Sequence, residues 1–72
     1  MRDQVELALG EYFSALGGEL PCDLYDVVLG EVEQPLLRSV MRYVGHNQSQ
    51  AADVLGISRG TLRKKLKAHG ML

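Results

Sequence analysis

The sequence has only one cysteine, Cys22, so no disulfide can form within the chain. It has no apolar run near the roughly 18 residues that a membrane-spanning helix needs, and Met1-Arg2-Asp3 does not open a signal-peptide pattern. These absences predict a protein of the reducing cytoplasm with no membrane partner. A chain of 72 residues buries only about 60% of its unfolded surface on folding. A second copy is therefore the expected source of further stability.

Side chains that carry catalysis are scarce. His46 and His69 are the only histidines, and the sequence contains no HExxH motif, glycine-rich phosphate loop or nucleophile elbow. Glu31 and Glu33 lie two residues apart, hence on different faces of a helix. We predict no enzyme activity, no catalytic residue and no cofactor. A metal site formed by a histidine with Cys22 is a minor alternative to surface histidines.

Charge is divided unevenly along the chain. Residues 1–45 carry three basic residues against eight acids, a net charge of −5, although the whole chain has a net charge of −1. Residues 46–72 carry five basic residues, all between Arg59 and Lys67, against the single acid Asp53, a net charge of +4. Such segregation is typical of a surface that meets an anionic partner.

The hydrophobic pattern predicts an all-α fold with four helices and no strand. From Asp3 to Leu16, apolar residues recur every three or four positions, which predicts an amphipathic helix that Gly17-Gly18 ends. A second helix is expected from an N-cap at Asp23 to about Val44. Pro35 either divides it into two helices or kinks one. The unchanged phase of the apolar positions across Pro35 favours one kinked helix.

Two shorter helices are predicted between residues 46 and 72. The first begins at Asn47, where Asn47-Gln48-Ser49-Gln50 has the residue types of a capping box. Gly56-Ile57-Ser58 forms a turn, and Ser58 caps a last helix over Arg59–Ala68. Two short helices joined in this way form a helix-turn-helix, whose second helix enters the DNA major groove.

The outer face of the last helix carries residues that recognise DNA. Successive residues of an α-helix are turned by about 100°. With Leu62 and Leu66 packed inward, Lys64 therefore points outward, and Arg59 stands at the N-terminal end of the helix. Arg59 is a predicted base contact because its guanidinium fork matches the O6 and N7 edge of guanine. Lys64, one further turn along the same approach, is the second predicted base contact. For Asn47 and Ser58 a role as helix cap alone is an alternative. The predicted contacts to the DNA backbone are Asn47, Gln48, Ser49, Ser58, Thr61, Arg63, Lys65 and Lys67.

Two stretches, EVEQPLL (residues 31–37) and NQSQAADVLGISRGTLRKKLKAHGM (residues 47–71), resemble the Fis family, named for the factor for inversion stimulation. The second stretch also suits the tail domain of a larger NtrC-type activator, but YFSALGGELPCDLYDVVLGEVEQPLL (residues 12–37) favours Fis. The resemblance implies a homodimer of one compact domain. In it, residues 1–45 of both subunits, with one helix kinked at Pro35, form a dimer core, and residues 46–72 form the DNA-binding unit.

The resemblance also implies a nucleoid-associated, DNA-bending transcription regulator that tolerates many sequences. The family carries Arg-Gly where this chain has Gly45-His46, which is expected to weaken contacts with flanking DNA and with RNA polymerase. Ser58 and Ala68 replace an asparagine and a lysine, and each change is expected to weaken backbone contacts. Since no N-terminal hairpin precedes the first helix, we expect binding and bending without stimulation of DNA invertases.

A protein-interaction adaptor is the alternative from a different functional class. In it, the acidic amphipathic half would pair with another protein and the basic residues would serve solubility. Salt separates the two functions, because a protein that neutralises several phosphates loses affinity steeply as salt rises.

Overall fold

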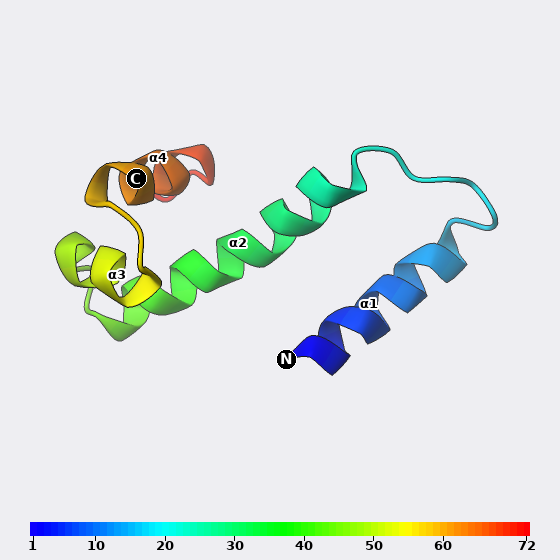
Figure 1. Ribbon diagram of the computed structural model, residues 1–72, viewed down its shortest axis with the longest axis horizontal. Helices are drawn as coiled ribbons and strands as arrows, with labels where there is room; N and C mark the ends of the chain where they lie inside the picture. Colours follow the sequence, from blue (N-terminus) through cyan, green and yellow to red (C-terminus); the bar gives the residue numbers. More distant parts are fainter.

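A computed structural model describes all 72 residues as four α-helices without a strand, which confirms the predicted fold class. The helices are α1 (Arg2–Ala15), α2 (Leu24–Tyr43), α3 (Gln48–Leu55) and α4 (Arg59–Ala68). In Figure 1, α3 and α4 gather at the C-terminal end of α2, and α1 lies on the side of its N-terminal half. None of the helices combines the length and the hydropathy that crossing a membrane would take.

The long helix α2 runs through Pro35 without a break. The single helix is therefore confirmed, and the division into two helices is wrong. Proline has no N–H, so the carbonyl of Glu31 lacks its partner four residues later, and only that one bond of the helix is lost. The start of α2 differs from expectation. Asp23 occupies the N-cap position, but its backbone is left-handed, with φ 53°, and its side chain accepts no hydrogen bond from the first turn. A capping side chain normally sits on an extended backbone.

The helix-turn-helix forms at the predicted positions. Asn47 caps α3 by accepting the N–H of Gln50 at 3.0 Å. The second bond of a capping box is absent, because the N–H of Asn47 donates to the carbonyl of Val44 at 3.3 Å. At the other end Gly56 takes φ 74°, the left-handed conformation that closes a helix most readily in glycine.

Six buried residues make up the core, and all lie between residues 37 and 66. Leu62 and Leu66 of α4 are 0% and 1% exposed, as predicted for the residues that anchor the recognition helix. Small side chains on α3 let the helices approach closely. The core residues are Leu37 and Met41 of α2, Ala51 and Ala52 of α3, and Leu62 and Leu66 of α4.

The N-terminal part of the chain adds nothing to this core. No residue of α1 is buried, and the buried residues of α2 are Leu37 and Met41, both in its C-terminal half. The radius of gyration is 14.8 Å, whereas a compact chain of this length would have about 11 Å. As a single copy the chain is thus more extended than a compact chain of the same length.

Candidate nucleic-acid interface

Both predicted base contacts on α4 are exposed. Lys64 lies opposite Leu62 and Leu66, which face the core, and Arg59 is exposed at the first position of the helix. Neither of these two cations makes an ion pair with another residue of the chain. Both charges are therefore available to an outside partner, and so is the charge of the exposed Lys67.

The start of α4 is organised by Ser58 and Thr61. The hydroxyl of Ser58 accepts the N–H of Thr61 at 3.1 Å and donates to its Oγ1 at 2.9 Å. The role of Ser58 as a helix cap is thus confirmed. Since the Thr61 hydroxyl acts as acceptor in this pair, its own proton is free to be donated to a phosphate oxygen.

The N-terminus of α3 adds an uncharged anion-binding element. The backbone N–H groups of Gln48 and Ser49 have no acceptor within the chain. Such first-turn amides, at the positive end of the helix dipole, favour phosphate. Arg63 Nη1 donates to Gln48 Oε1 at 2.8 Å and thereby joins this end of α3 to α4. The structure brings the predicted contacts Gln48, Ser49 and Arg63 onto one continuous surface.

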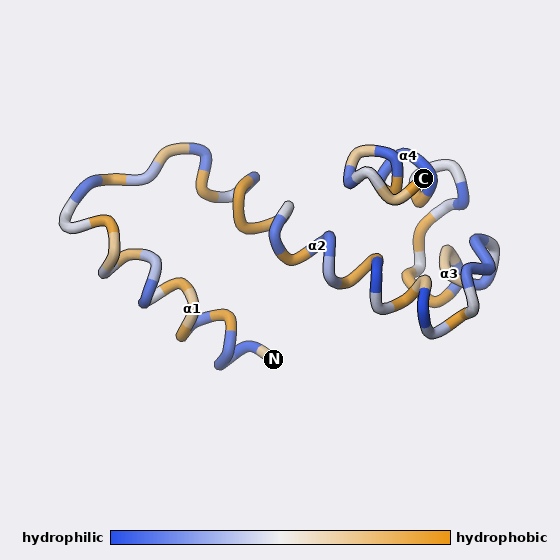
Figure 2. Tube along the Cα trace, turned by 180° about the vertical axis from the view of Figure 1, so that it is seen from behind, coloured by the Kyte–Doolittle hydropathy of each residue, from blue (hydrophilic) through white to orange (hydrophobic).

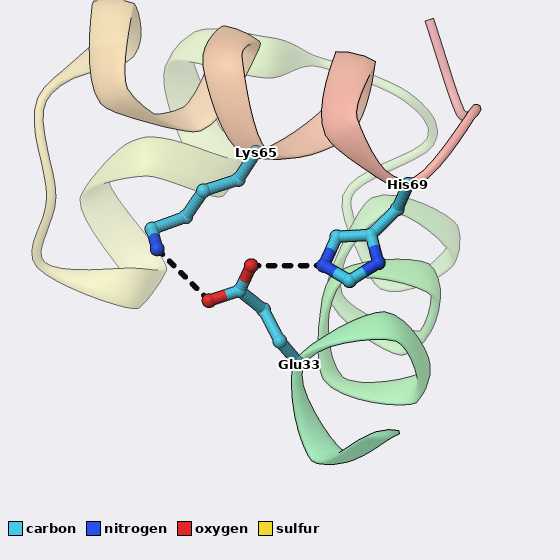
Figure 3. A network of polar contacts seen from close by, with 3 residues as sticks. All are labelled: Glu33, Lys65 and His69. Carbon is cyan, nitrogen blue, oxygen red and sulfur yellow. Dashed lines mark hydrogen bonds and ion pairs between the residues drawn. The ribbon is translucent and has the colours of Figure 1, made fainter. Parts of the chain in front are cut away.

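Lys65 is placed differently from the other predicted contacts. Its ammonium lies 2.8 Å from Glu33 Oε2, and the other oxygen of this carboxylate lies 2.9 Å from His69 Nε2 (Figure 3). Lys65 therefore reaches across to α2 instead of pointing outward with Lys64. Sequence reasoning missed Glu33 and His69, because residues 32 and 36 positions apart share no local pattern.

These contacts hold the pKa of Glu33 below its ordinary value of 4.5. The hydrogen bond from Lys65 is the largest cause, followed by the one from His69, and partial desolvation opposes both. A carboxyl whose pKa is lowered by folding stabilises the folded state above the pKa of the unfolded chain. This stabilisation is lost as pH falls through the pKa of the folded state.

We expect Glu33→Gln to lower the free energy of unfolding at pH 7 by about 0.2–1 kcal/mol, the usual range for exposed ion pairs. The deficit relative to the wild type should shrink as pH falls below about 4.5, because the carboxyl of the unfolded wild-type chain takes up a proton first and that of the folded chain only at lower pH. Urea denaturation of both proteins between pH 7 and pH 3 measures it. A deficit that stays constant across this range would contradict the role of the charge.

A groove separates α1 from the N-terminal half of α2. It has a volume of about 500 Å³, and eight of its ten lining residues are hydrophobic. In Figure 2, hydrophobic segments recur along both helices. The lining residues are Gln4, Val5, Ala8, Leu9 and Tyr12 of α1, and Leu24, Val27, Val28, Glu31 and Val32 of α2.

The alternative of a metal site finds no support in the structure. No three His, Cys, Asp or Glu side chains gather closely enough to hold a metal ion. Cys22 is exposed in the loop between α1 and α2, and His69 is engaged by Glu33.

Comparison with known proteins assigns the family. Residues 28–69, which include the whole packed unit, match the family described as bacterial regulatory protein, Fis family. The chain belongs to the Fis family. Three curated relatives are named DNA-binding protein Fis. The relative from Mannheimia haemolytica is 56% identical over 71 residues, which is 99% of this chain and 72% of the relative. The relatives from Proteus mirabilis and Yersinia pestis are 58% identical over the same shares.

The extent of these similarities bears on the tail-domain alternative. Identity of 56–58% over 99% of the chain includes α1 and the loop after it, not the helix-turn-helix alone. The similarity to Fis proteins therefore extends to α1 and the loop after it, which the resemblance to an NtrC-type tail domain does not cover.

Proposed function

We propose that this Fis-family protein binds double-stranded DNA as a homodimer, bends it, and acts as a nucleoid-associated transcription regulator in the cytoplasm. The observation that carries the proposal is the exposed cationic face of α4, held in place by Leu62 and Leu66 in the core. A helix held in this way, with its partner helix across the DNA backbone, suits the major groove. The relatives' shared name, DNA-binding protein Fis, supports the same function.

Individual roles follow from position and chemistry. Arg59, at the first position of α4, and Lys64, further along its exposed face, are the proposed base contacts. The remaining predicted residues contact phosphates and set register and affinity. Those proposed backbone contacts are Asn47, Gln48, Ser49, Ser58, Thr61, Arg63, Lys65 and Lys67.

The apolar groove between α1 and α2 is the proposed binding site for a second copy of the chain. Leu7, Tyr12 and Phe13 of α1 are 67%, 42% and 46% exposed, which is unusual for large apolar side chains on an otherwise amphipathic helix. A chain of this size also lacks the core to stabilise such a helix alone. Residues 1–45 of two subunits would cover one another, and residues 46–72 would project as two DNA-binding units.

Bending follows from the dimer that we propose. Two recognition helices meet successive major grooves of straight B-DNA only when they are about 34 Å apart. A closer pair requires the duplex to curve, and the energy of bending depends on base pairs that the protein does not touch. This mechanism gives a tolerant sequence preference with an A·T-rich centre.

The turn after α2 is the proposed position of any contact with RNA polymerase or flanking DNA. Gly45 and His46 both take left-handed φ values, 62° and 67°. A hydrogen bond of 2.8 Å from the N–H of His46 to the carbonyl of Met41 fixes the turn. Since the arginine of the family is missing here, we propose that both contacts are weak.

A gel-shift titration on circularly permuted fragments with an A·T-rich site, at two salt concentrations, tests the function. We expect salt-sensitive binding and a mobility of the complex that depends on where the site lies in the fragment. No shift at low salt would contradict DNA binding and favour the adaptor. A shift with constant mobility would contradict bending alone.

Arg59→Ala is expected to weaken binding to a preferred site by about 1–3 kcal/mol per subunit and to relax sequence preference at the contacted base pair. Lys67→Ala serves as the comparison. It should weaken all DNA sequences about equally and reduce the slope of log affinity against log salt by about 0.9 per subunit. Fluorescence anisotropy with matched and mismatched duplexes measures both. Equal loss on every sequence for Arg59→Ala would contradict a base contact.

A further inference from the structure

The carboxylate of Glu33 holds two donors of the recognition helix at once. Lys65 of α4 and His69, the C-cap residue of that helix, stand one turn apart, and each contacts one oxygen of the carboxylate, at 2.8 Å and 2.9 Å. Figure 3 shows the three side chains converging between α2 and α4. One of the five basic residues of the DNA-binding half is therefore occupied by an acid from the other half of the chain.

No other charged group shares this cluster. These two contacts are the only ion pairs in the structure. On α2 itself the residues one turn from Glu33 are Leu29, Gly30, Leu36 and Leu37, which are uncharged. Asp53, the one charged residue of α3, pairs with neither Lys65 nor His69. Lys65 and His69 are thus the two partners that can balance the charge of Glu33.

The two partners of Glu33 differ in freedom. The side chain of Lys65 is 38% exposed and has a long flexible stem, whereas that of His69 is 17% exposed and has a short rigid one. Lys65 can turn from Glu33 toward a DNA phosphate, which offers its ammonium an equivalent anionic oxygen. His69 cannot follow it. Arg63, by contrast, leaves only the neutral amide of Gln48 when it turns to DNA.

We propose that Glu33 is an affinity-determining residue of the DNA interface, because it competes with DNA phosphate for Lys65 and retains only His69 once the complex forms. The inference rests on the proposed DNA binding and deepens it. After Lys65 has left, His69 is the one remaining partner of the carboxylate.

The first test is Glu33→Gln, measured by fluorescence anisotropy on a duplex with an A·T-rich centre. Removing the competitor should tighten binding by about 1.5- to 5-fold per subunit, the equivalent of a partly exposed ion pair. A homodimer should then bind about 2- to 25-fold more tightly. Asp26→Asn is the matched control, because it removes one negative charge from the same helix at a residue with no ion pair. It should change affinity by less than Glu33→Gln.

The second test asks whether the effect of Glu33→Gln depends on Lys65. In a Lys65→Ala background, Glu33→Gln should no longer tighten binding, because the cation for which Glu33 competes is gone. Lys65→Ala alone should reduce the salt slope by about 0.9 per subunit.

The outcomes separate this inference from the function on which it rests. Wild-type binding with Glu33→Gln no tighter than Asp26→Asn would overturn the competition and leave DNA binding in place. Weaker binding by a folded Glu33→Gln would assign Glu33 a purely structural role and overturn it as well. If that variant lost helix content by circular dichroism, the salt slope of Lys65→Ala would decide alone, because an unchanged slope would show that Lys65 does not leave Glu33 for DNA. No binding by the wild type would overturn both proposals.

Discussion

Leu62→Ala is expected to unfold the helix-turn-helix and to abolish DNA binding. Leu62 is 0% exposed, and replacing a buried leucine by alanine costs about 2–5 kcal/mol, depending on how far the cavity collapses. The core contains only six buried residues, and a core in a chain this small rarely supplies more than about 3–5 kcal/mol. The loss is therefore of the same size as the whole stability of the folded unit.

Thermal unfolding followed by circular dichroism measures this effect, together with a gel shift at low salt. Val54→Ala is the matched control, because Val54 lies on α3 and is 57% exposed. It should change the free energy of unfolding by less than about 0.5 kcal/mol. A cooperative transition of Leu62→Ala close to that of Val54→Ala would show that α4 is not held by this residue.

Features that depend on neighbours in the sequence could be predicted. The caps at Asn47 and Ser58 each use an N–H three residues later, and both hydrogen bonds form. The helical phase of α4 identified Leu62 and Leu66 as buried, because a helix fixes the direction of every side chain once two of them are known. Local geometry was therefore sufficient for most of the candidate DNA-binding surface.

Features that depend on distant residues could not be predicted. Helical phase places Lys65 on the flank of α4, but only the packing of α4 against α2 brings it to Glu33. The contact between Arg63 and Gln48 likewise joins residues 15 positions apart. Asp23 shows the same limit at a helix start, since its left-handed backbone is set by the path of the loop and not by its residue type.

The division of charge takes a different meaning once the fold is known. The acidic and basic halves are separate in the sequence, but Glu33 brings one acid of the first half against the recognition helix of the second. The remaining basic side chains of α4 have no acidic partner, so the cationic face persists. A chain with a net charge of −1 can present such a face because all of its acids lie outside α4.

Val28→Asp is expected to separate the proposed homodimer and to remove specific DNA binding with it. Val28 lines the apolar groove between α1 and α2. An unpaired carboxylate buried at an interface costs about 3 kcal/mol or more. A dimer carries two such charges, so its dissociation constant should rise by about four orders of magnitude. Sedimentation equilibrium measures the association, and a gel shift measures the loss of DNA affinity.

Tyr25→Asp is the control for this change. Tyr25 lies on the same helix, is 76% exposed, and is not among the residues that line the groove. It adds the same charge in the first turn of α2, where the helix dipole favours an acid, and should leave a dimer intact. A Val28→Asp protein that remains a dimer would place the interface elsewhere. A wild-type protein that is monomeric at every concentration would instead require each chain to bind DNA through a single helix-turn-helix, without the paired contacts that force the duplex to bend.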